Sequence, residues 1–194
     1  MQPERPFACA EILQALTSVE AEVTRFFGSL SDEEVSSRQG KAWTPAEHLV
    51  HLNISVNAVA RGLSISSWLL SLRFGRTRVP SRTYEEIHRI YRVRLAEGAG
   101  ATGPYVPPQE ELVGEAVASR RSEILARWQR VNARLRTAQE GWSERQLDRV
   151  RLPHPLLGKL TVREMLFFTL YHNQHHIAAS KRRLPRFGSE PLTG

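Results

Sequence analysis

The sequence contains a single cysteine, Cys9, among 194 residues. One thiol cannot form an internal disulfide, and without a cysteine pair any metal ion would have to bind histidine or carboxylate side chains. Apolar residues nowhere run for the roughly 20 positions that a membrane-spanning helix needs, and the first five residues lack the basic-then-apolar order of a secretion signal. We therefore expect no membrane association and a cytoplasmic location.

The composition is that of a globular protein. Hydrophobic residues make up 41% and charged residues 24%, which excludes a disordered chain, and the simplest organisation is a single domain over residues 1–194. The formal charge of +7 raises the question of a nucleic-acid partner. The arginines of residues 120–136 are, however, interleaved with acidic and amide residues as on a solvated helix face, and the basic cluster 181–186 follows a predicted helix. Nucleic-acid binding is therefore not expected, and a small-molecule substrate is.

The chain shows no convincing alternation of apolar and polar residues at period two, whereas apolar residues recur at steps of three and four. This periodicity predicts four long helices, at about residues 8–30, from 44 into the sixties, 109–139 and 161–181. A short helix is expected at 83–95, and residues 68–72 could extend the second long helix. We predict an all-α fold: an antiparallel four-helix bundle with irregular connections and short extra helices.

The last predicted helix carries two histidines on its core-facing side. The stripe advances by three or four residues through Val162, Met165, Thr169, His172 and His176. Imidazoles four residues apart on a helix can share one metal ion, with each nitrogen about 2 Å from it. The alternative is a pair of buried histidines that hydrogen-bond to polar neighbours. His172 and His176 are thus candidate metal ligands.

A third ligand would have to come from another part of the chain. On a helical wheel His48 lies about 60° and His51 about 120° from the centre of the apolar stripe of the second helix, so periodicity slightly favours His48 and leaves both open. His175 falls about 100° from His176 and should lie outside the core or at its rim. His88 and His154 lie in or beside irregular segments and are expected at the surface.

Two stretches resemble the DinB-like superfamily of four-helix bundles. Residues 43–52 (WTPAEHLVHL) are similar to its tryptophan-led helix start, with a histidine-leucine pair eight residues after the tryptophan. Residues 154–166 (HPLLGKLTVREML), followed by His172 and His176, are similar to its His-Pro, Gly and His-x-x-x-His segment. One departure is that Ala179 or Ser180 replaces a glutamine usual near the last histidine. The resemblance covers essentially the whole chain and selects His51, not His48.

The resemblance implies a divalent metal ion, zinc or nickel, held by His51, His172 and His176. The superfamily includes transferases and isomerases that use bacillithiol or mycothiol, so the implied function is a thiol S-transferase or a related detoxifying activity, with a low-molecular-weight thiol as cosubstrate. A non-catalytic metal-binding module and a metal-dependent hydrolase remain alternatives, and homodimers are common among such proteins.

The sequence identifies no catalytic base. Glu47 and Glu164 are each expected to be surface residues. Arginines of the third helix, such as Arg127 or Arg130, are candidates for binding an anionic substrate at the mouth of the site.

Overall fold

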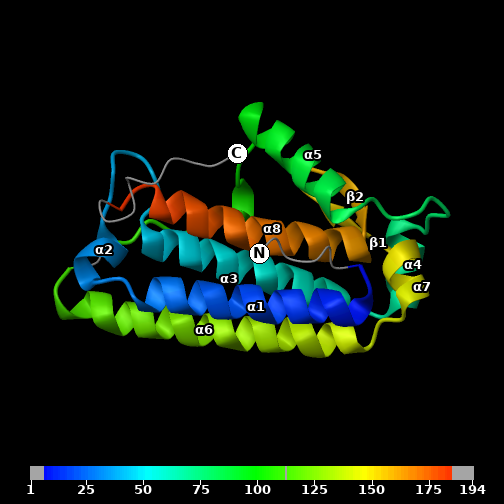
Figure 1. Cartoon of the computed structure of the whole chain (residues 1–194), viewed down its shortest axis with the longest axis horizontal. Coiled ribbons are helices and arrows are strands. Elements are labelled where there is room, and N and C mark those ends of the chain that lie inside the picture. The colour runs from blue at the N-terminus through cyan, green and yellow to red at the C-terminus, as the bar shows by residue number, and fades with distance from the viewer. Residues whose placement is uncertain (1–6, 112, 185–194) are drawn as a thin grey trace.

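Four long helices lie side by side in the structure, a computed structural model that describes residues 7–111 and 113–184 (Figure 1). They are α1 (Cys9–Gly28), α3 (Pro45–Leu63), α6 (Glu115–Glu140) and α8 (Val162–Lys181). The shorter elements are α2 (Asp32–Ser36), α4 (Ser67–Phe74), α5 (Tyr84–Ala96), the 3-10 turn η1 (Gly103–Tyr105), α7 (Glu144–Arg149), β1 (Arg151–His154) and β2 (Gly158–Thr161). The prediction of a mostly helical chain is confirmed.

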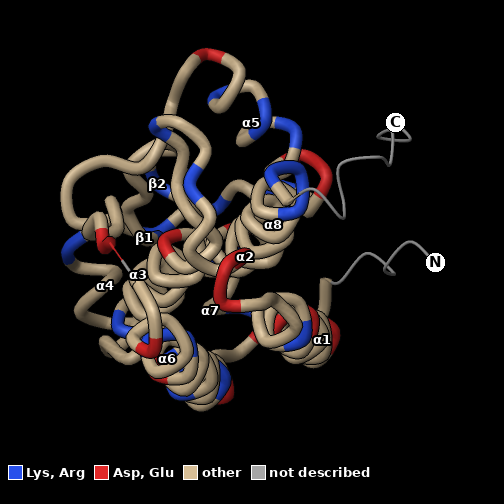
Figure 2. Tube along the Cα trace, turned by 90° about the vertical axis from the view of Figure 1, so that its left-hand side faces the viewer, with Lys and Arg blue, Asp and Glu red and all other residues tan. Residues whose placement is uncertain are grey.

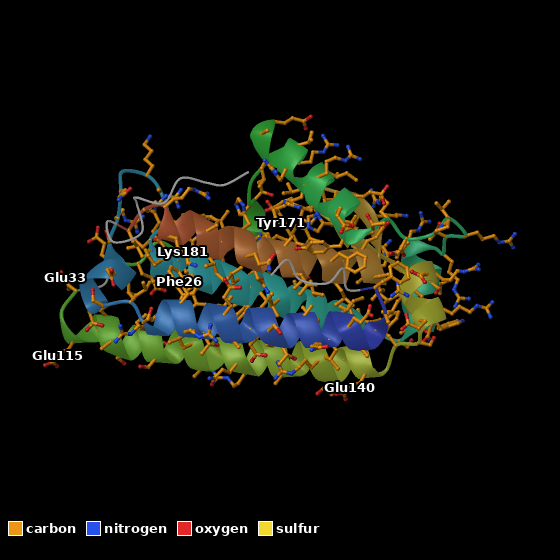
Figure 3. The ribbon with its side chains drawn as sticks, in the orientation of Figure 1. Phe26, Glu33, Glu115, Glu140, Tyr171 and Lys181 are labelled. Carbon is orange, nitrogen blue, oxygen red and sulfur yellow. The ribbon has the colours of Figure 1, made fainter. Side chains whose placement is uncertain are left out.

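Helices α1 and α8 run parallel to each other. At one end, the guanidinium of Arg163 in α8 donates to the carbonyl of Phe7, just before α1. At the other end, Lys181 of α8 lies over the ring of Phe26 in α1, with its Nζ 5.5 Å from the ring centroid (Figure 3). The first and the last long helix therefore start at the same end of the molecule.

Helices α3 and α6 form a second parallel pair. The Asn53 amide donates to the carbonyl of Ile124, and the indole of Trp142, after α6, donates to the carbonyl of Leu63 at the end of α3. A parallel pair requires a long crossover, and α4, α5 and η1 supply it. The expected antiparallel packing thus holds between the two pairs, for α3 with α8 and α1 with α6, and does not hold within them.

The start of α3 is fixed by a capping box. The Thr44 hydroxyl accepts from the backbone N–H of Glu47, and the Glu47 carboxylate accepts from the backbone N–H of Thr44. Arg38 pairs with the same carboxylate at 2.6 Å, and Glu47 is only 3% exposed. The expectation that Glu47 lies at the surface is therefore wrong, because capping and ion pairing bury its side chain.

The start of α8 repeats this arrangement. Thr161 and Glu164 cap each other's backbone N–H groups, and Arg82 binds both carboxylate oxygens of Glu164, at 2.8 and 3.0 Å. Glu164 is buried as well, so its predicted surface position is also wrong. In both cases a capping partner three residues upstream was the signal available in the sequence.

A short hairpin leads into α8, where the sequence predicted no strand. β1 pairs antiparallel with β2 in the register Arg151↔Thr161 to His154↔Gly158, and Gly158 adopts a φ of +74° at the turn. Leu152 and Leu160 face each other across the hairpin and are buried. Strands of four residues are too short to show a period-two pattern in the sequence.

Two predicted helix boundaries also differ from the structure. Helix α6 begins at Glu115 rather than near residue 109, because Gly114, with φ +58° and ψ −141°, has a conformation outside the helical region. Leu112, counted in that predicted helix, lies outside the described residues. Residues 68–72 belong to the separate helix α4, whose N-cap Ser66 accepts from the backbone N–H of Leu69. The predicted short helix at 83–95 is confirmed as α5.

Apolar side chains of all four long helices meet in one core, with Trp128 of α6 and Phe167 of α8 fully buried. The hairpin closes one end of this core through Leu152 and Leu160. Among the described residues, no helix has both the length and the apolar character needed to span a membrane.

Candidate metal centre

Three histidines from two helices meet inside the molecule. The Nε2 atom of His172 lies 3.0 Å from Nε2 of His51 and 3.1 Å from Nε2 of His176. His172 and His176 are one turn apart on α8, and the antiparallel helix α3 brings His51 to the same level. All three side chains are buried. The structure thus brings together the three residues that the sequence singled out as ligands.

The donor set fits a divalent cation. Burial lowers the pKa of His51, against the smaller raising effect of its hydrogen bond to Tyr105. Burial also lowers the pKa values of His172 and His176 well below the usual value, and for these two the neighbouring histidine rings add to the effect. The three rings are therefore neutral at pH 7, which is the form of imidazole that binds metals. Nitrogens about 3 Å apart can each lie about 2 Å from one shared ion. His51, His172 and His176 could accordingly hold a metal ion.

The orientation of His51 is fixed by the backbone of η1. Its Nδ1–H donates to the carbonyl oxygen of Tyr105 at 2.7 Å. A carbonyl can only accept, so the proton of the neutral ring is on Nδ1 and the lone pair of Nε2 faces the other two histidines. Hydrogen bonds of this kind hold metal-binding histidines in the required tautomer. The sequence gives no sign of the role of Tyr105, because a backbone contact across 54 residues leaves no pattern.

His48, the other candidate on α3, contacts the cluster through His176. Its Nδ1 lies 2.8 Å from Nδ1 of His176, and Nη1 of Arg183 donates to its Nε2 at 2.8 Å. Burial, followed by the charge of Arg183, lowers the pKa of His48 to about 3, so this ring is neutral. Both histidines that periodicity left open are therefore buried at the site. His51 belongs to the cluster, and His48 contacts its outer side.

Trp43 covers the cluster. The centroid of its ring system lies 5.0 Å from that of His51 and 5.5 Å from that of His48, and it stacks on His176 at 6.1 Å with an angle of 16° between the planes. This indole therefore packs against two of the three clustered rings, those of His51 and His176. A tryptophan directly before the capping box of α3 was visible in the sequence, but its contact with the histidines was not.

His154 is buried, contrary to the surface position expected from the sequence. Its Nδ1 accepts hydrogen bonds from the backbone N–H groups of Leu156 and Leu157, both at 3.1 Å, and its ring packs against Phe168 at 4.2 Å. Burial lowers the pKa of His154 to about 4. The ring therefore organises the hairpin turn in its neutral form.

The two remaining histidines lie outside the cluster. His88 is half-buried on α5, where its ring packs against Tyr171 at 3.8 Å between centroids. His175 is half-buried next to the cluster, in agreement with the rim position predicted for it.

A large cleft opens beside the histidines. Its volume is about 1470 Å³, and His48, His51, His172, His175 and His176 line part of it. Apolar side chains of α4, α5, the hairpin and α8 form much of the remaining wall, including Leu70, Leu95, Leu152 and Phe168. The cleft is therefore large enough for a small-molecule ligand that reaches the cluster.

Arg127 and Arg130, the arginines proposed for an anionic substrate, are exposed on α6 and do not line this cleft. That expectation is wrong for these two positions, since they lie on the outer face of the helix. Arg134, one turn after Arg130, does line the cleft, as do Arg182 and Arg183 after α8.

The fold and the cluster define a class: mostly helical proteins in which a three-histidine site able to bind a metal lies between two long helices. A family model described as the DinB superfamily matches residues 15–179, so the chain belongs to this superfamily. The matched segment includes His51, His172 and His176, and the resemblance found in the sequence is confirmed. Neither the search of curated proteins nor that of solved structures returned a match.

Proposed function

We propose that His51, His172 and His176 bind a divalent metal ion, zinc or nickel, and that the protein is a metal-dependent thiol S-transferase acting on small molecules. The observation that carries this proposal is the convergence of three buried, neutral imidazoles beside an open cleft. Structural zinc sites are closed by four protein ligands, whereas catalytic sites keep a position for water or substrate. Three ligands at a cleft correspond to the second kind. The four long helices are, in this proposal, the metal-holding bundle.

The charges of the cleft wall favour a thiol rather than water as the nucleophile. The charged side chains that line the described part of the wall are all basic. A bound divalent metal ion deprotonates a coordinated thiol without a separate base. Water as the nucleophile is usually assisted by a carboxylate base, as in metalloproteases. A site whose wall is basic therefore suits a nucleophile that is already anionic when bound.

The residues of the site have separate roles in this proposal. His51 keeps its lone pair towards the cluster through its bond to Tyr105, and His176 is held by His48. Trp43 packs against the rings of His51 and His176. The apolar side chains of the cleft hold the body of the electrophile, so that its reactive atom comes close to the thiolate.

The test combines metal analysis with a conjugation assay. Wild type, His172→Ala and a control, His88→Ala, are purified after growth with zinc and nickel, and metal content is measured by mass spectrometry. We expect about one metal ion per chain in wild type and in the control, and none in His172→Ala. The His172→Ala variant should still fold, because catalytic metal sites contribute less to folding than structural ones. The three proteins are then assayed with a panel of low-molecular-weight thiols and a chromogenic aryl halide.

Thiol conjugation that follows metal content supports the transferase. Metal binding without turnover by any thiol would favour the non-catalytic module, and hydrolysis that needs no thiol would favour the hydrolase. Metal-free wild-type protein after growth with both metals would refute the proposal as a whole.

A further inference from the structure

The cleft beside the histidines carries positive charge along its wall. Among the described residues, five cationic side chains line it, and neither aspartate nor glutamate does. The five are Lys41, Arg61, Arg134, Arg182 and Arg183. Such a distribution raises the local concentration of anionic ligands and disfavours cationic ones.

Three of these cations gather at the end of the cleft that holds the histidines. Gln39 donates to the backbone carbonyl of Arg183 at 2.6 Å, which joins the loop containing Lys41 to the end of α8. The charges of Arg182 and Arg183 both act on the rings of His48 and His175. Figure 2 views this end of the molecule, where the last turn of α8 is basic. Arg61 lies on α3 about 20 Å beyond His48. It is therefore too far from Arg182 and Arg183 to bind the same small anion.

The side-chain partner of Arg183 is neutral. Other arginines of the protein bind carboxylates, as Arg82 does with Glu164, but none of the ion pairs within residues 7–111 and 113–184 includes Arg182 or Arg183. Arg183 instead donates to the neutral ring of His48. A guanidinium bonded to a neutral nitrogen gains more from a carboxylate or phosphate, which can accept two parallel hydrogen bonds.

Occupation of the histidine cluster weakens the contact between Arg183 and His48 further. When His176 uses Nε2 as a ligand, its proton is on Nδ1, which then donates to Nδ1 of His48. His48 must in that case carry its own proton on Nε2, the atom that now accepts from Arg183. Two donors cannot share this position, so Arg183, which lines the cleft, would lose this bond.

We propose that Arg183, assisted by Arg182 and Lys41, binds a carboxylate or phosphate group of the substrate, and that the substrates of this protein are anionic molecules with an apolar body. The anionic group lies at the histidine end of the cleft, and the apolar body lies along Tyr91, Leu95 and Phe168. This inference rests on the proposed function and names the substrate class of the same site.

The experiment measures binding rather than turnover. Zinc-loaded protein is titrated calorimetrically with 4-phenylbutyrate and with 4-phenylbutanol, its neutral analogue. Wild type is compared with the double variant Arg182→Gln/Arg183→Gln and with a control of equal charge change on the outer face of α6, Arg127→Gln/Arg130→Gln. Zinc content and thermal unfolding are recorded for each, and Arg183→Lys serves as the conservative variant if the double variant unfolds.

We expect wild type and the control to bind the carboxylate about tenfold more tightly than the alcohol, as one charge-assisted hydrogen bond predicts. The Arg182→Gln/Arg183→Gln variant should lose this preference while it keeps its zinc and its affinity for the alcohol. Arg183→Lys should keep part of the preference for the carboxylate, because lysine keeps the positive charge but cannot form the bidentate hydrogen bonds of a guanidinium.

The proposal would be overturned if the Arg182→Gln/Arg183→Gln variant still bound the carboxylate more tightly than the alcohol. If that preference then disappeared in His172→Ala, the anion would be bound by the metal instead. Failure of the proposed function gives a different result. Protein that binds no metal and turns over no substrate could still show an Arg183-dependent preference for the carboxylate. The anion site would then be supported and the thiol transferase would not.

Discussion

Replacement of His154 by asparagine tests the account of the buried histidines. The Nδ1 atom of His154 accepts from two backbone N–H groups, and the side-chain oxygen of asparagine can accept in the same turn without titrating. The variant His154→Asn should therefore keep the hairpin and lose one titrating group. It isolates the contribution of that ring to the pH dependence of stability.

The size of the expected change in unfolding free energy follows from the pKa of His154. This pKa is about 4 in the folded chain, against an ordinary value of 6.5. Between these values the unfolded chain binds more protons than the folded one, so the free energy of unfolding falls as the pH falls. From pH 7 to pH 5 this one ring accounts for a loss of about 2 kcal/mol. At pH 7 it has almost no effect through titration, because the ring is neutral in both states.

Urea unfolding followed by circular dichroism, in the presence of a chelator at pH 7, 6 and 5, measures this loss. We expect the decrease in unfolding free energy to be about 2 kcal/mol smaller for His154→Asn than for wild type. His88→Asn is the control, since His88 is only half-buried. The same pH dependence in wild type and His154→Asn would refute the claim that His154 is held neutral by burial.

Two further predictions concern the surroundings of the cluster. Because Trp43 stacks on His176, Trp43→Phe should remove most of the fluorescence quenching that Ni²⁺ causes in wild type; equal quenching in both proteins would show that the metal binds elsewhere. Because His48 is 2.8 Å from the outer nitrogen of His176, His48→Phe should weaken zinc binding by about tenfold in a chelator competition, with His88→Phe unchanged; identical affinities would exclude a supporting role for His48.

The sequence predicted the parts of this protein that repeat at helical spacing. The stripe from Val162 to His176 identified α8, its inward face and two of the clustered histidines, because a regular helix determines which residues share a face. The choice of His51 over His48 came from the resemblance to the DinB superfamily. Helical periodicity could not make this choice, since the rings of His48 and His51 are both buried.

What the sequence did not predict depends on contacts between distant segments. The bond from His51 to Tyr105, the position of Arg183 against His48 and the packing of His154 against Phe168 all join residues that no local pattern relates. Glu47 and Glu164 were misassigned for a similar reason, because each is buried by an arginine from outside its own helix. A single domain over residues 1–194, a homodimer, a cytoplasmic location and the choice between zinc and nickel stay predictions.

The pairing of His51 with His172 spans 121 positions of the chain. An ion bound to both would act as a cross-link between distant parts of the folded chain, and because it binds the folded form and not the unfolded one it would stabilise the fold by mass action. α3 and α8 must already be docked before such a cross-link can form, so metal capture belongs to the last stage of folding. The stability of the folded chain would then rise with the concentration of free metal ion.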